Sequence, residues 1–342
     1  MNKKVVVGLS GGVDSAMSAL KLKNSGMQVL GLYIMMHENY TDSLQKAKQA
    51  ADQAEIDFDT VDKRDEFKEI VINQFVNEYL KGRTPNPCVI CNSNIKIATL
   101  CDEADKRGYD FVATGHYARI DKDPKIGRYT VFCAEDGKKD QSYMLWQLNQ
   151  KQLSKLITPL SNEYKNILKN DAKKVFSAAE YDESQEICFI PSNDYVSFIN
   201  NYLSAEQLPP PGNFIDSDGK IIGRHKGIHN YTIGQRHGLG IVLGERAFIT
   251  KIDTKMNDIT VGVTGDEFTD TFKADNLNFM VEDIPEYVTV KTRYHSKKYP
   301  VKVEFIENYV KVTSEIPLRA ITPGQSAVFY KDNMVLFGGL IG

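Results

Sequence analysis

The strongest constraint on the fold is the way the first apolar run, residues 5–9, passes directly into the loop Ser-Gly-Gly-Val-Asp-Ser at residues 10–15 and then into a helical stretch. A strand that turns tightly into a helix is the beginning of a βαβ unit. The alternation continues along the first half of the chain, with strands expected at 28–34, 58–61 and 111–114 and helices at 15–25 and 41–54. We therefore predict an α/β fold class whose N-terminal domain is built on a parallel sheet.

The character of the sequence changes at residues 209–212, Pro-Pro-Pro-Gly. Beyond this point short alternating runs follow one another, with turn signals but without helical stretches between them. Strands are expected at residues 247–252, 259–263, 287–294, 301–305, 310–313, 328–330 and 335–337. Many short strands of this kind are typical of small β domains and of barrels. We expect three domains: a catalytic α/β domain at residues 1–206, a central small β domain at 207–270, and a C-terminal β-barrel at 271–342.

Composition and charge predict an ordinary globular protein of a reducing compartment. The 342 residues carry 42 Lys and Arg against 45 Asp and Glu, a net charge of −3, so a nucleic-acid partner would need a local basic patch. The N-terminus lacks the apolar run and cleavage site of a signal peptide, and no stretch is long enough to span a membrane. Five cysteines, an odd number, favour free thiols over a disulfide framework. We therefore expect a cytoplasmic protein with no membrane partner.

The loop at residues 10–15 has the composition of an anion site. Its two glycines let backbone N–H groups close on an anion, and Ser10 and Ser15 add hydroxyl donors at the positive end of the following helix. The loop lacks the Gly-Lys-Ser/Thr ending of a Walker loop and the three-glycine spacing of a dinucleotide site. The plainer alternative is a capped strand-to-helix turn. Gly115 and His116 follow the strand at 111–114, at the edge where parallel sheets bind ligands.

Three cysteines are candidates for chemistry. Cys88 and Cys91 lie in a proline-stiffened loop just ahead of a predicted helix, a position that favours the thiolate. Cys188 lies where a polar loop, which begins at Glu183, enters an apolar run. A structural zinc site would need four ligands and a thioredoxin-like dithiol would need the rest of that fold, so sulfur chemistry beside the anion loop is the favoured interpretation. The two remaining cysteines fall in apolar patterns and are expected in the core: Cys101 and Cys133.

Two basic clusters lie in the predicted β domains. The first falls within residues 219–244, which contain no acidic residue, and consists of Lys220, Arg224, Lys226 and Arg236 with His225, His229 and His237. The second consists of Lys291, Arg293, His295, Lys297 and Lys298. Lys291 and Arg293 are two residues apart and so should share one face of the expected strand. A solvated basic face explains either cluster alone, whereas two clusters beside an anion-binding domain favour contacts with a nucleic-acid backbone.

Taken together, these motifs resemble those of the tRNA-uridine 2-sulfurtransferases, also called tRNA-specific 2-thiouridylases. The loop at residues 10–15 resembles the PP-loop of the ATP pyrophosphatases, the superfamily to which those enzymes belong. The likeness extends through residues 82–87, 91–92, 113–119, 139–143, 187–190, 231–240, 291–294 and 322–328. It therefore covers nearly the whole chain, and the set of motifs is far more specific than any one member.

The resemblance implies adenylation of the wobble uridine in a tRNA anticodon loop at O2, followed by sulfur transfer that gives 2-thiouridine. It places ATP and Mg²⁺ among Gly8, Leu9, Ser10, Gly11, Gly12, Val13, Asp14, Ser15, Ile34 and Gly115, with Asp14 organising the pyrophosphate. It assigns the target base and other tRNA contacts to Asn86, Pro87, Cys88, Lys139, Asp140, Gln141, Arg293 and Tyr294. It makes Cys91 and Cys188 the catalytic pair, joined by a disulfide during the reaction, and implies a sulfur-donor protein or persulfide relay as partner.

The chain departs from the family pattern at Cys88, because many members carry an Asp at that position. The departure argues against a carboxylate general base there and adds a third thiol. Two sulfur-transfer routes stay open: a persulfide on Cys188 that Cys91 resolves, or an iron–sulfur cluster held by Cys88, Cys91 and Cys188 with one iron open to an extra sulfide. Two rival functions also stay open, an RNA-binding module with structural zinc and a PP-loop ligase that acts on a small substrate.

Overall fold

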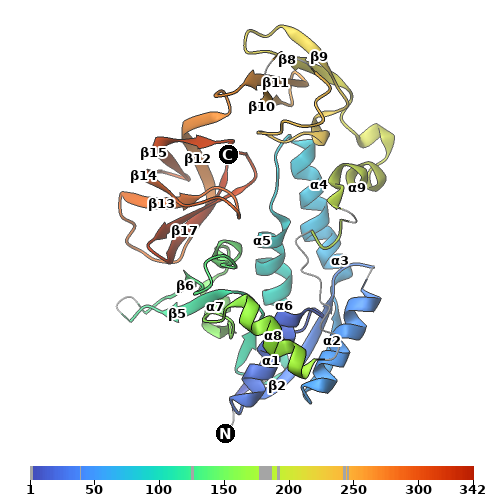
Figure 1. Cartoon of the computed structure of the whole chain (residues 1–342), viewed down its shortest axis with the longest axis vertical. Coiled ribbons are helices and arrows are strands. Elements are labelled where there is room, and N and C mark those ends of the chain that lie inside the picture. The colour runs from blue at the N-terminus through green and yellow to red at the C-terminus, as the bar shows by residue number, and fades with distance from the viewer. Residues whose placement is uncertain are drawn as a thin grey trace.

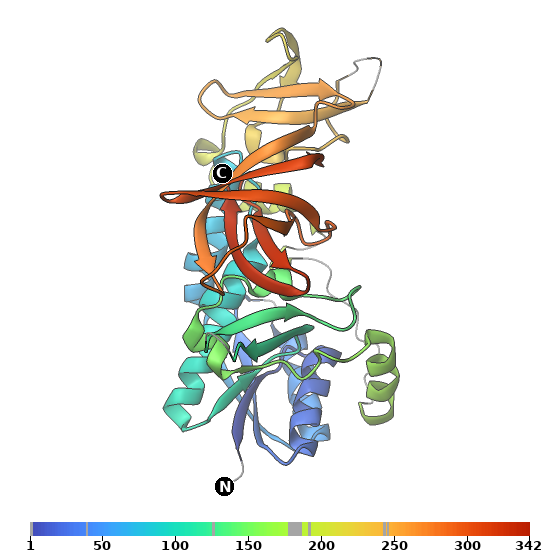
Figure 2. The ribbon, with the colours of Figure 1, turned by 90° about the vertical axis from the view of Figure 1, so that its left-hand side faces the viewer.

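A computed structural model describes residues 3–38, 40–124, 127–176, 187–190, 193–241, 244 and 246–342. An α/β domain and two β modules succeed one another along the long axis of the molecule (Figure 1). The view turned by 90° shows the C-terminal barrel in space between the α/β domain and the other β module, which precedes the barrel in the sequence (Figure 2). The predicted α/β class with two small β domains is confirmed. Among the described residues, no helix is long and apolar enough to cross a membrane.

The N-terminal domain is a five-stranded parallel sheet in the order β3-β2-β1-β4-β7. Its strands are β1 (Lys4–Gly8), β2 (Gln28–Met35), β3 (Asp57–Asp62), β4 (Phe111–Ala113) and β7 (Leu156–Ile157). Helices cover both faces of β1: α1 (Val13–Asn24) and α2 (Thr41–Gln53) pack on Val5 and Val7, and α6 (Ile97–Arg107) packs on Val6. The strand order reverses at β1, and parallel sheets bind ligands at the carboxyl edge beside such a reversal.

Two long helices, each interrupted by a π-helical turn, stand beside this sheet (Figure 1). The first comprises α3 (Arg64–Phe67), η1 (Lys68–Ile72) and α4 (Asn73–Leu80), and the second comprises α5 (Pro87–Cys91), η2 (Asn92–Lys96) and α6. The second helix corrects the sequence analysis, which placed Cys88 and Cys91 in a loop ahead of the helix. The helix already begins at Pro87, because proline has a helical φ and lacks the N–H that a first turn leaves unbonded.

The central β module is a four-stranded sheet in the order β10-β11-β8-β9. Its strands are β8 (Gly212–Ile215), β9 (Ile221–His225), β10 (Ala247–Asp253) and β11 (Asp258–Val263). Phe214, Tyr231 and Ile249 lie in a small core of its own. Helix α7 (Gln150–Lys155) comes directly before β7, and α8 (Lys165–Val175) and α9 (Tyr195–Tyr202) lie between β7 and this module in the sequence.

The C-terminal module is an antiparallel barrel, as the sequence predicts. Its strands follow the order β12-β15-β14-β13-β16-β17, and a further pairing of β12 with β17 closes the ring. They are β12 (Phe268–Phe279), β13 (Tyr287–Lys291), β14 (Tyr299–Ile306), β15 (Tyr309–Arg319), β16 (Ser326–Lys331) and β17 (Met334–Ile341). Closure leaves none of the six strands as a free edge of this ring.

Strand β13 is shorter than the sequence predicts, because it ends at Lys291 rather than at residue 294. The chain turns there, since Ser296 Oγ accepts hydrogen bonds from the backbone N–H groups of Thr292 and Arg293 at 3.2 and 3.3 Å. Lys291 and Arg293 therefore do not share a strand face, contrary to the expectation from their spacing.

An inserted segment and a shared sheet edge join the barrel to the α/β domain. The hairpin of β5 (Ala118–Lys122) and β6 (Tyr129–Cys133) extends the barrel sheet through β17. Trp146 follows the 3₁₀ turn η3 (Ser142–Leu145), is fully buried, and donates from Nε1 to Ser326 Oγ at 2.9 Å. Tyr143 donates to the carbonyl of the same serine at 2.9 Å. One continuous core therefore contains residues of both the parallel sheet and the barrel.

The close approach of β17 to Trp146 predicts a stability defect. A Cβ added at Gly338 would lie 2.5 Å from two ring atoms of Trp146. We expect Gly338→Ala to lower the free energy of unfolding by about 1–3 kcal/mol, because overpacking forces neighbouring groups apart. Trp146 is the single tryptophan of the chain, so its fluorescence during urea unfolding reports this directly. Gly137→Ala is the control, since a Cβ there meets no atom within 4 Å, and equal stability of the two variants would contradict the prediction.

Candidate active site

The loop at residues 10–15 is closed by its own hydroxyl groups. Ser15 Oγ donates to the Gly12 carbonyl at 2.8 Å and accepts from the Ser10 N–H at 3.2 Å. Gly11 has a φ of +80°, and a Cβ there would lie 2.5 Å from the Ser43 carbonyl oxygen, so only glycine fits. Ser15 is buried and braces the loop from inside. The turn therefore presents the N-terminus of α1 as a site for an anion.

Other residues predicted around the nucleotide meet this loop at the carboxyl edge of the sheet. Gly115, just after β4, lies so close that a Cβ would be 2.8 Å from the Asp14 carbonyl carbon and 2.9 Å from the Ser15 nitrogen. Ile34 lies near the end of β2 with its side chain almost fully buried. His116 Nδ1 and Thr114 Oγ1 share a hydrogen bond of 2.8 Å. The structure thus brings the predicted segments together.

Asp14 is held by an ion pair that sequence analysis missed. Lys165 Nζ lies 2.5 Å from both carboxylate oxygens, and the Tyr117 hydroxyl donates to one of them at 2.9 Å. Lys165 is the first residue of α8 and is 7% exposed. No local motif around Lys165 signals this role, because the pair joins positions 151 residues apart. The carboxylate expected to organise Mg²⁺–pyrophosphate is therefore already neutralised by the protein.

The segment predicted to face the target base lies between the α/β domain and the barrel. Asn86 precedes α5 and donates from Nδ2 to Met144 Sδ at 3.9 Å. The Lys291 ammonium lies 5.6 Å from the ring centre of Tyr294. Burial, together with the negative charges of Asp140 and Cys88, raises the pKa of Tyr294 to about 12. Asn86 and Tyr294 thus both border the turn η3, since the ring centre of Tyr294 lies 6.1 Å from that of Tyr143.

Thr84 and Pro85, which precede Asn86, are hydrogen-bonded to both β modules. Gln325 Nε2 donates to the carbonyls of Thr84 and Pro85 at 2.9 and 3.2 Å, and the Thr84 N–H donates to the Pro323 carbonyl at 2.8 Å. Thr84 Oγ1 donates to Thr232 Oγ1 of the central module at 3.1 Å. Both β modules thus fix the backbone just before α5. These hydrogen bonds join residues far apart in the sequence, so local sequence patterns do not reveal them.

Several predicted tRNA contacts also have structural partners inside the protein. Arg293 Nη2 donates to the carbonyls of Ile233 and Ala320 at 3.2 and 3.1 Å and to Thr322 Oγ1, so it brackets the central module and the barrel. Burial lowers the pKa of Arg293. Asp140 and Gln141 stabilise the loop in which they lie, since Asp140 accepts from the Ser142 hydroxyl at 2.9 Å and Gln141 Oε1 accepts from the Tyr117 N–H at 2.9 Å. Lys139, beside them, is half-buried.

The three candidate thiols lie in one region of the fold, because Cys88 precedes Cys91 on α5 and the neighbours of Cys188, Ile187 and Phe189, pack in the same core as Cys91. Cys88 is half-buried, Cys91 is buried and Cys188 is exposed, and all three interact electrostatically with Lys96. Burial raises the pKa of Cys91 to about 12, which corrects the expectation that its place near a helix start favours the thiolate. Desolvation by its surroundings also raises the pKa of Cys188, whereas Lys96 lowers it. All five cysteines of the chain are free thiols, and Cys101 is buried in the core as predicted while Cys133 is only half-buried.

The described residues do not form a metal site. None of their His, Cys, Asp and Glu side chains make a group of three or more that could hold a metal ion. Among the residues that the structure describes, Cys88, Cys91 and Cys188 are thus not arranged as a ready metal site. The polar part of the loop before Cys188, from Glu183 to Glu186, lies outside the described residues.

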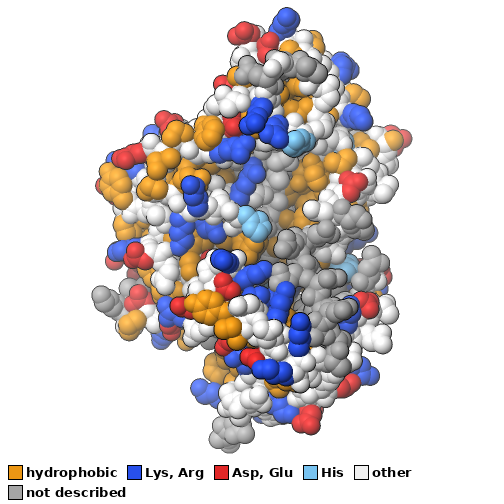
Figure 3. Space-filling view, in the orientation of Figure 1, with side chains coloured by type: hydrophobic (Ala, Val, Ile, Leu, Met, Phe, Trp, Pro, Cys, Tyr) orange, Lys and Arg blue, Asp and Glu red, His pale blue; other side chains and the backbone are white. Residues whose placement is uncertain are grey.

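The first basic cluster separates into exposed cations and buried histidines. Lys220, Arg224, Lys226 and Arg236 are exposed, but His225 and His229 are 1% and 2% exposed. His225 and His229 were grouped with the cations only by sequence proximity. Their rings instead face the Asn257 carbonyl and Asn200 Oδ1, each at 3.0 Å. Figure 3 shows Lys and Arg side chains in a band that runs down this face from the central module past the barrel to the α/β domain.

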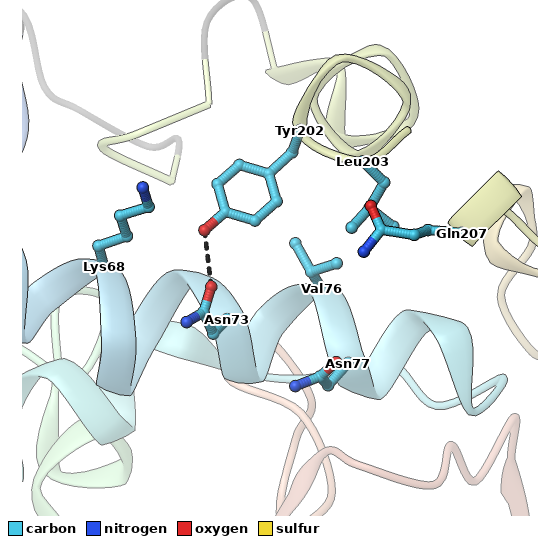
Figure 4. A pocket seen from close by; sticks show the side chains of 7 residues that line it. All are labelled: Lys68, Asn73, Val76, Asn77, Tyr202, Leu203 and Gln207. Atoms are coloured by element: carbon cyan, nitrogen blue, oxygen red, sulfur yellow. Dashed lines mark hydrogen bonds between the residues drawn. The ribbon is translucent and has the colours of Figure 1, made fainter. Parts of the chain in front are cut away.

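A separate hollow of about 410 Å³ lies between η1–α4 and α9. Figure 4 shows Lys68, Asn73 and Tyr202 directed into it, with the Tyr202 hydroxyl donating to Asn73 Oδ1 at 2.6 Å. Another hollow, of about 770 Å³, lies on the barrel beside Phe279 and Phe305. Neither is lined by a residue that the sequence analysis assigned to the site.

Family models match nearly the whole chain. Residues 3–192 match the model described as tRNA methyl transferase HUP domain, residues 196–263 the tRNA methyl transferase PRC-barrel domain, and residues 269–341 the aminomethyltransferase beta-barrel domain. The chain is 41% identical to tRNA-specific 2-thiouridylase MnmA 1 of Clostridium tetani, over 100% of this chain and 97% of the relative. It is 40% identical to the tRNA-specific 2-thiouridylase MnmA of Carboxydothermus hydrogenoformans, over 99% and 97%.

A solved structure resembles the chain only distantly. It is the U34-tRNA thiolase NcsA of Methanococcus maripaludis with its [4Fe-4S] cluster, 20% identical, with a TM-score of 0.37 over 59% of this chain and 65% of that one. A likeness at this level carries no argument about the cofactor of this protein.

The partly buried His116 beside the loop makes stability depend on pH. Burial, with a smaller effect of Lys96, lowers the pKa of His116 to about 3, whereas a histidine in an unfolded chain titrates near about 6.5. The unfolded chain therefore binds more protons below about pH 6.5, and the folded state loses stability as the pH falls. We expect His116→Asn to remove about 1–2 kcal/mol of the loss between about pH 7 and pH 5. Urea unfolding of both proteins at the two pH values checks this, and parallel pH dependences would refute it.

Proposed function

Because the chain belongs to the family of the tRNA-specific 2-thiouridylases, we propose that it replaces O2 of the wobble uridine of tRNA with sulfur in an ATP-dependent reaction. The observation that supports the proposal is that one chain carries an anion loop closed by its own hydroxyl groups, a turn before α5 that both β modules hold, and Cys91 beside Lys96 on the helix that begins with that turn. The rival functions are not supported, since the described residues contain no zinc site and the relatives match over the full chain. A cytoplasmic location suits both tRNA and reduced thiols.

The first step is adenylation of the base. Uridine O2 forms a bond to the α-phosphorus of ATP, the bond to pyrophosphate breaks, and N3 of the base gives up its proton. The backbone N–H groups of the loop at residues 10–15 and the N-terminus of α1 hold the phosphates. Mg²⁺, when bound, neutralises charge on the departing pyrophosphate. Because Asp14 is paired with Lys165, it is not presented as a free metal ligand, and Lys165 is the fixed cation beside the loop.

The second step is sulfur transfer through a persulfide. The terminal sulfur of a Cys188 persulfide attacks C2 of the adenylated base and AMP leaves, which joins the base to Cys188 through two sulfur atoms. The Cys91 thiol then attacks the Cys188 sulfur, gives its proton to N3, and releases 2-thiouridine with a Cys91–Cys188 disulfide. A dithiol reductant returns both thiols, and a persulfide-bearing donor protein recharges Cys188. Exposure of Cys188 and burial of Cys91 support this division of roles.

The tRNA contacts are proposed on the β modules and the turn before α5. The target base must leave its stack, at a cost of about a few kcal/mol, to reach Asn86, Pro87 and Cys88. Phosphate contacts by the exposed cations of the central module offset that cost. Lys291 and Tyr294 form a cation and ring pair beside the same turn, where an unstacked base can rest on the ring. Lys139 lies on the loop that Asp140 and Gln141 hold.

Removal of single thiols tests the sulfur route. The persulfide route predicts that anaerobically purified protein is colourless and free of iron, and that Cys88→Ala still makes 2-thiouridine. Cys91→Ala and Cys188→Ala should both be inactive, because each removes one partner of the final disulfide. Iron analysis, visible absorption and mass spectrometry of tRNA nucleosides provide the readouts. Iron and colour that disappear in Cys88→Ala together with activity would instead establish the cluster held by Cys88, Cys91 and Cys188.

The exposed cations predict how salt affects binding. We expect Arg224→Gln and Lys226→Gln each to weaken tRNA binding across tRNA species and to reduce the slope of log affinity against log salt by up to about one unit. ATP binding should be unchanged. Lys302→Gln is the matched control, because Lys302 lies on the barrel in an ion pair with Glu286 at 2.7 Å. Salt slopes equal to that of the unsubstituted protein would show that these two cations do not face the RNA.

A further inference from the structure

Lys96 lies at a place in the fold where a cation is unexpected. It follows Ile95 and precedes Ile97, both of which are buried in the apolar cores against which this helix packs. A lysine in such surroundings commonly pairs with a carboxylate. Among the described residues, no hydrogen bond or ion pair joins the Lys96 ammonium to an acidic group. Its neighbour one π-helical turn earlier is Cys91, and the residues on either side of Cys188, Ile187 and Phe189, pack in the same core as Cys91 and Ile95.

The π-helical turn explains how Lys96 reaches the thiols. In an α-helix, residues five positions apart point in different directions, and neighbours on one face are three or four positions apart. The turn η2, Asn92–Lys96, contains one residue more per turn, as the hydrogen bond from the Ile97 N–H to the Asn92 carbonyl shows. Lys96 therefore lies over Cys91 on one helix face, and the Cys91 thiol itself donates to Met36 Sδ at 3.8 Å. The inserted residue thus aligns a cation with the sulfur atoms.

Lys96 also connects the thiols to the nucleotide edge. Its charge acts on His116, which follows the Gly115 that touches the anion loop. The Lys96 side chain is only partly buried, which lets its ammonium keep its positive charge. A fixed cation in a poorly solvated position interacts more strongly with an anion than it would in water.

We propose that Lys96 is a catalytic residue of the sulfur-transfer step, and that its ammonium stabilises the negative charge on the sulfur atoms as that charge moves from the Cys188 persulfide to the base and then to the disulfide exchange. This rests on the proposed function. The persulfide enters the site as an anion, and its charge leaves with AMP when the carbon–sulfur bond forms. Negative charge develops again on sulfur when Cys91 attacks Cys188, and it ends on the base, where N3 takes the proton. A preorganised cation lowers the barrier of such steps without reorganisation of solvent.

The test separates the two chemical steps in the full-length protein. Single-turnover reactions contain a tRNA transcript, ATP and glutathione persulfide as the sulfur donor. Pyrophosphate release reports adenylation, and mass spectrometry of nucleosides reports 2-thiouridine. We expect Lys96→Met to slow 2-thiouridine formation by about 100-fold, as loss of one charge-stabilising group does elsewhere, while pyrophosphate release changes by less than about threefold. Lys96→Arg, which keeps the charge, should restore most of the sulfur-transfer rate.

The matched control is Lys106→Met, on the exposed part of the same helix, which should behave as the unsubstituted protein. Equal impairment of Lys96→Met and Lys96→Arg would overturn the proposal, because it would show a packing role. A parallel loss of both steps, or an unimpaired Lys96→Met, would also overturn it. If Lys96→Met fails to fold, Lys96→Gln makes the same comparison. A failure of the unsubstituted protein to form any 2-thiouridine would overturn the proposed function itself.

Discussion

The rest of the structure depends on the insertion of one short segment of the α/β domain into the barrel. Trp146 and Tyr143 both bond to Ser326, and Asn278 of β12 donates to the Trp146 carbonyl at 2.6 Å. These contacts make the parallel sheet and the barrel share one core, so neither can shift without breaking buried hydrogen bonds. With the barrel fixed, Gln325 fixes the carbonyls of Thr84 and Pro85. The position of the first turn of α5, and of the thiols on it, follows from packing remote from the site.

Two lysines supply the site with fixed charge, and they do so in different ways. Lys165 neutralises Asp14 beside the anion loop, which leaves a net attraction for phosphate in the backbone N–H groups and the helix dipole. Lys96 lies beside Cys91, and no acidic side chain of the described residues pairs with it, so its charge is available to whatever anion forms there. His116 between them is kept neutral by burial. The site is thus divided into a phosphate end and a sulfur end, each with its own cation.

Local patterns predicted the parts of this structure that local physics determines. The alternation of strands and helices, the glycine turn at residue 11 and the short strands of the barrel all follow from neighbouring residues. Local patterns did not predict the ion pair of Asp14 with Lys165 or the hydrogen bond from Gln325 to the Thr84 carbonyl, because both contacts join distant parts of the chain. The sequence gives one indication of the role of Lys96, its position between Ile95 and Ile97. Its alignment with Cys91 depends on a π-helical turn, which sequence patterns do not reveal.

The barrel can close only after its last strand has left the ribosome, because β17 is the final strand of the chain. Strand β17 pairs with β12, with β16 and with β6, and it carries the Gly338 that packs on Trp146. During synthesis the α/β domain emerges long before β17, so Trp146 must wait without its partner while most of the chain is translated. Apolar surface exposed in this interval invites association with other nascent chains or capture by chaperones. The yield of folded protein in a cell should therefore be set by how quickly this late strand arrives.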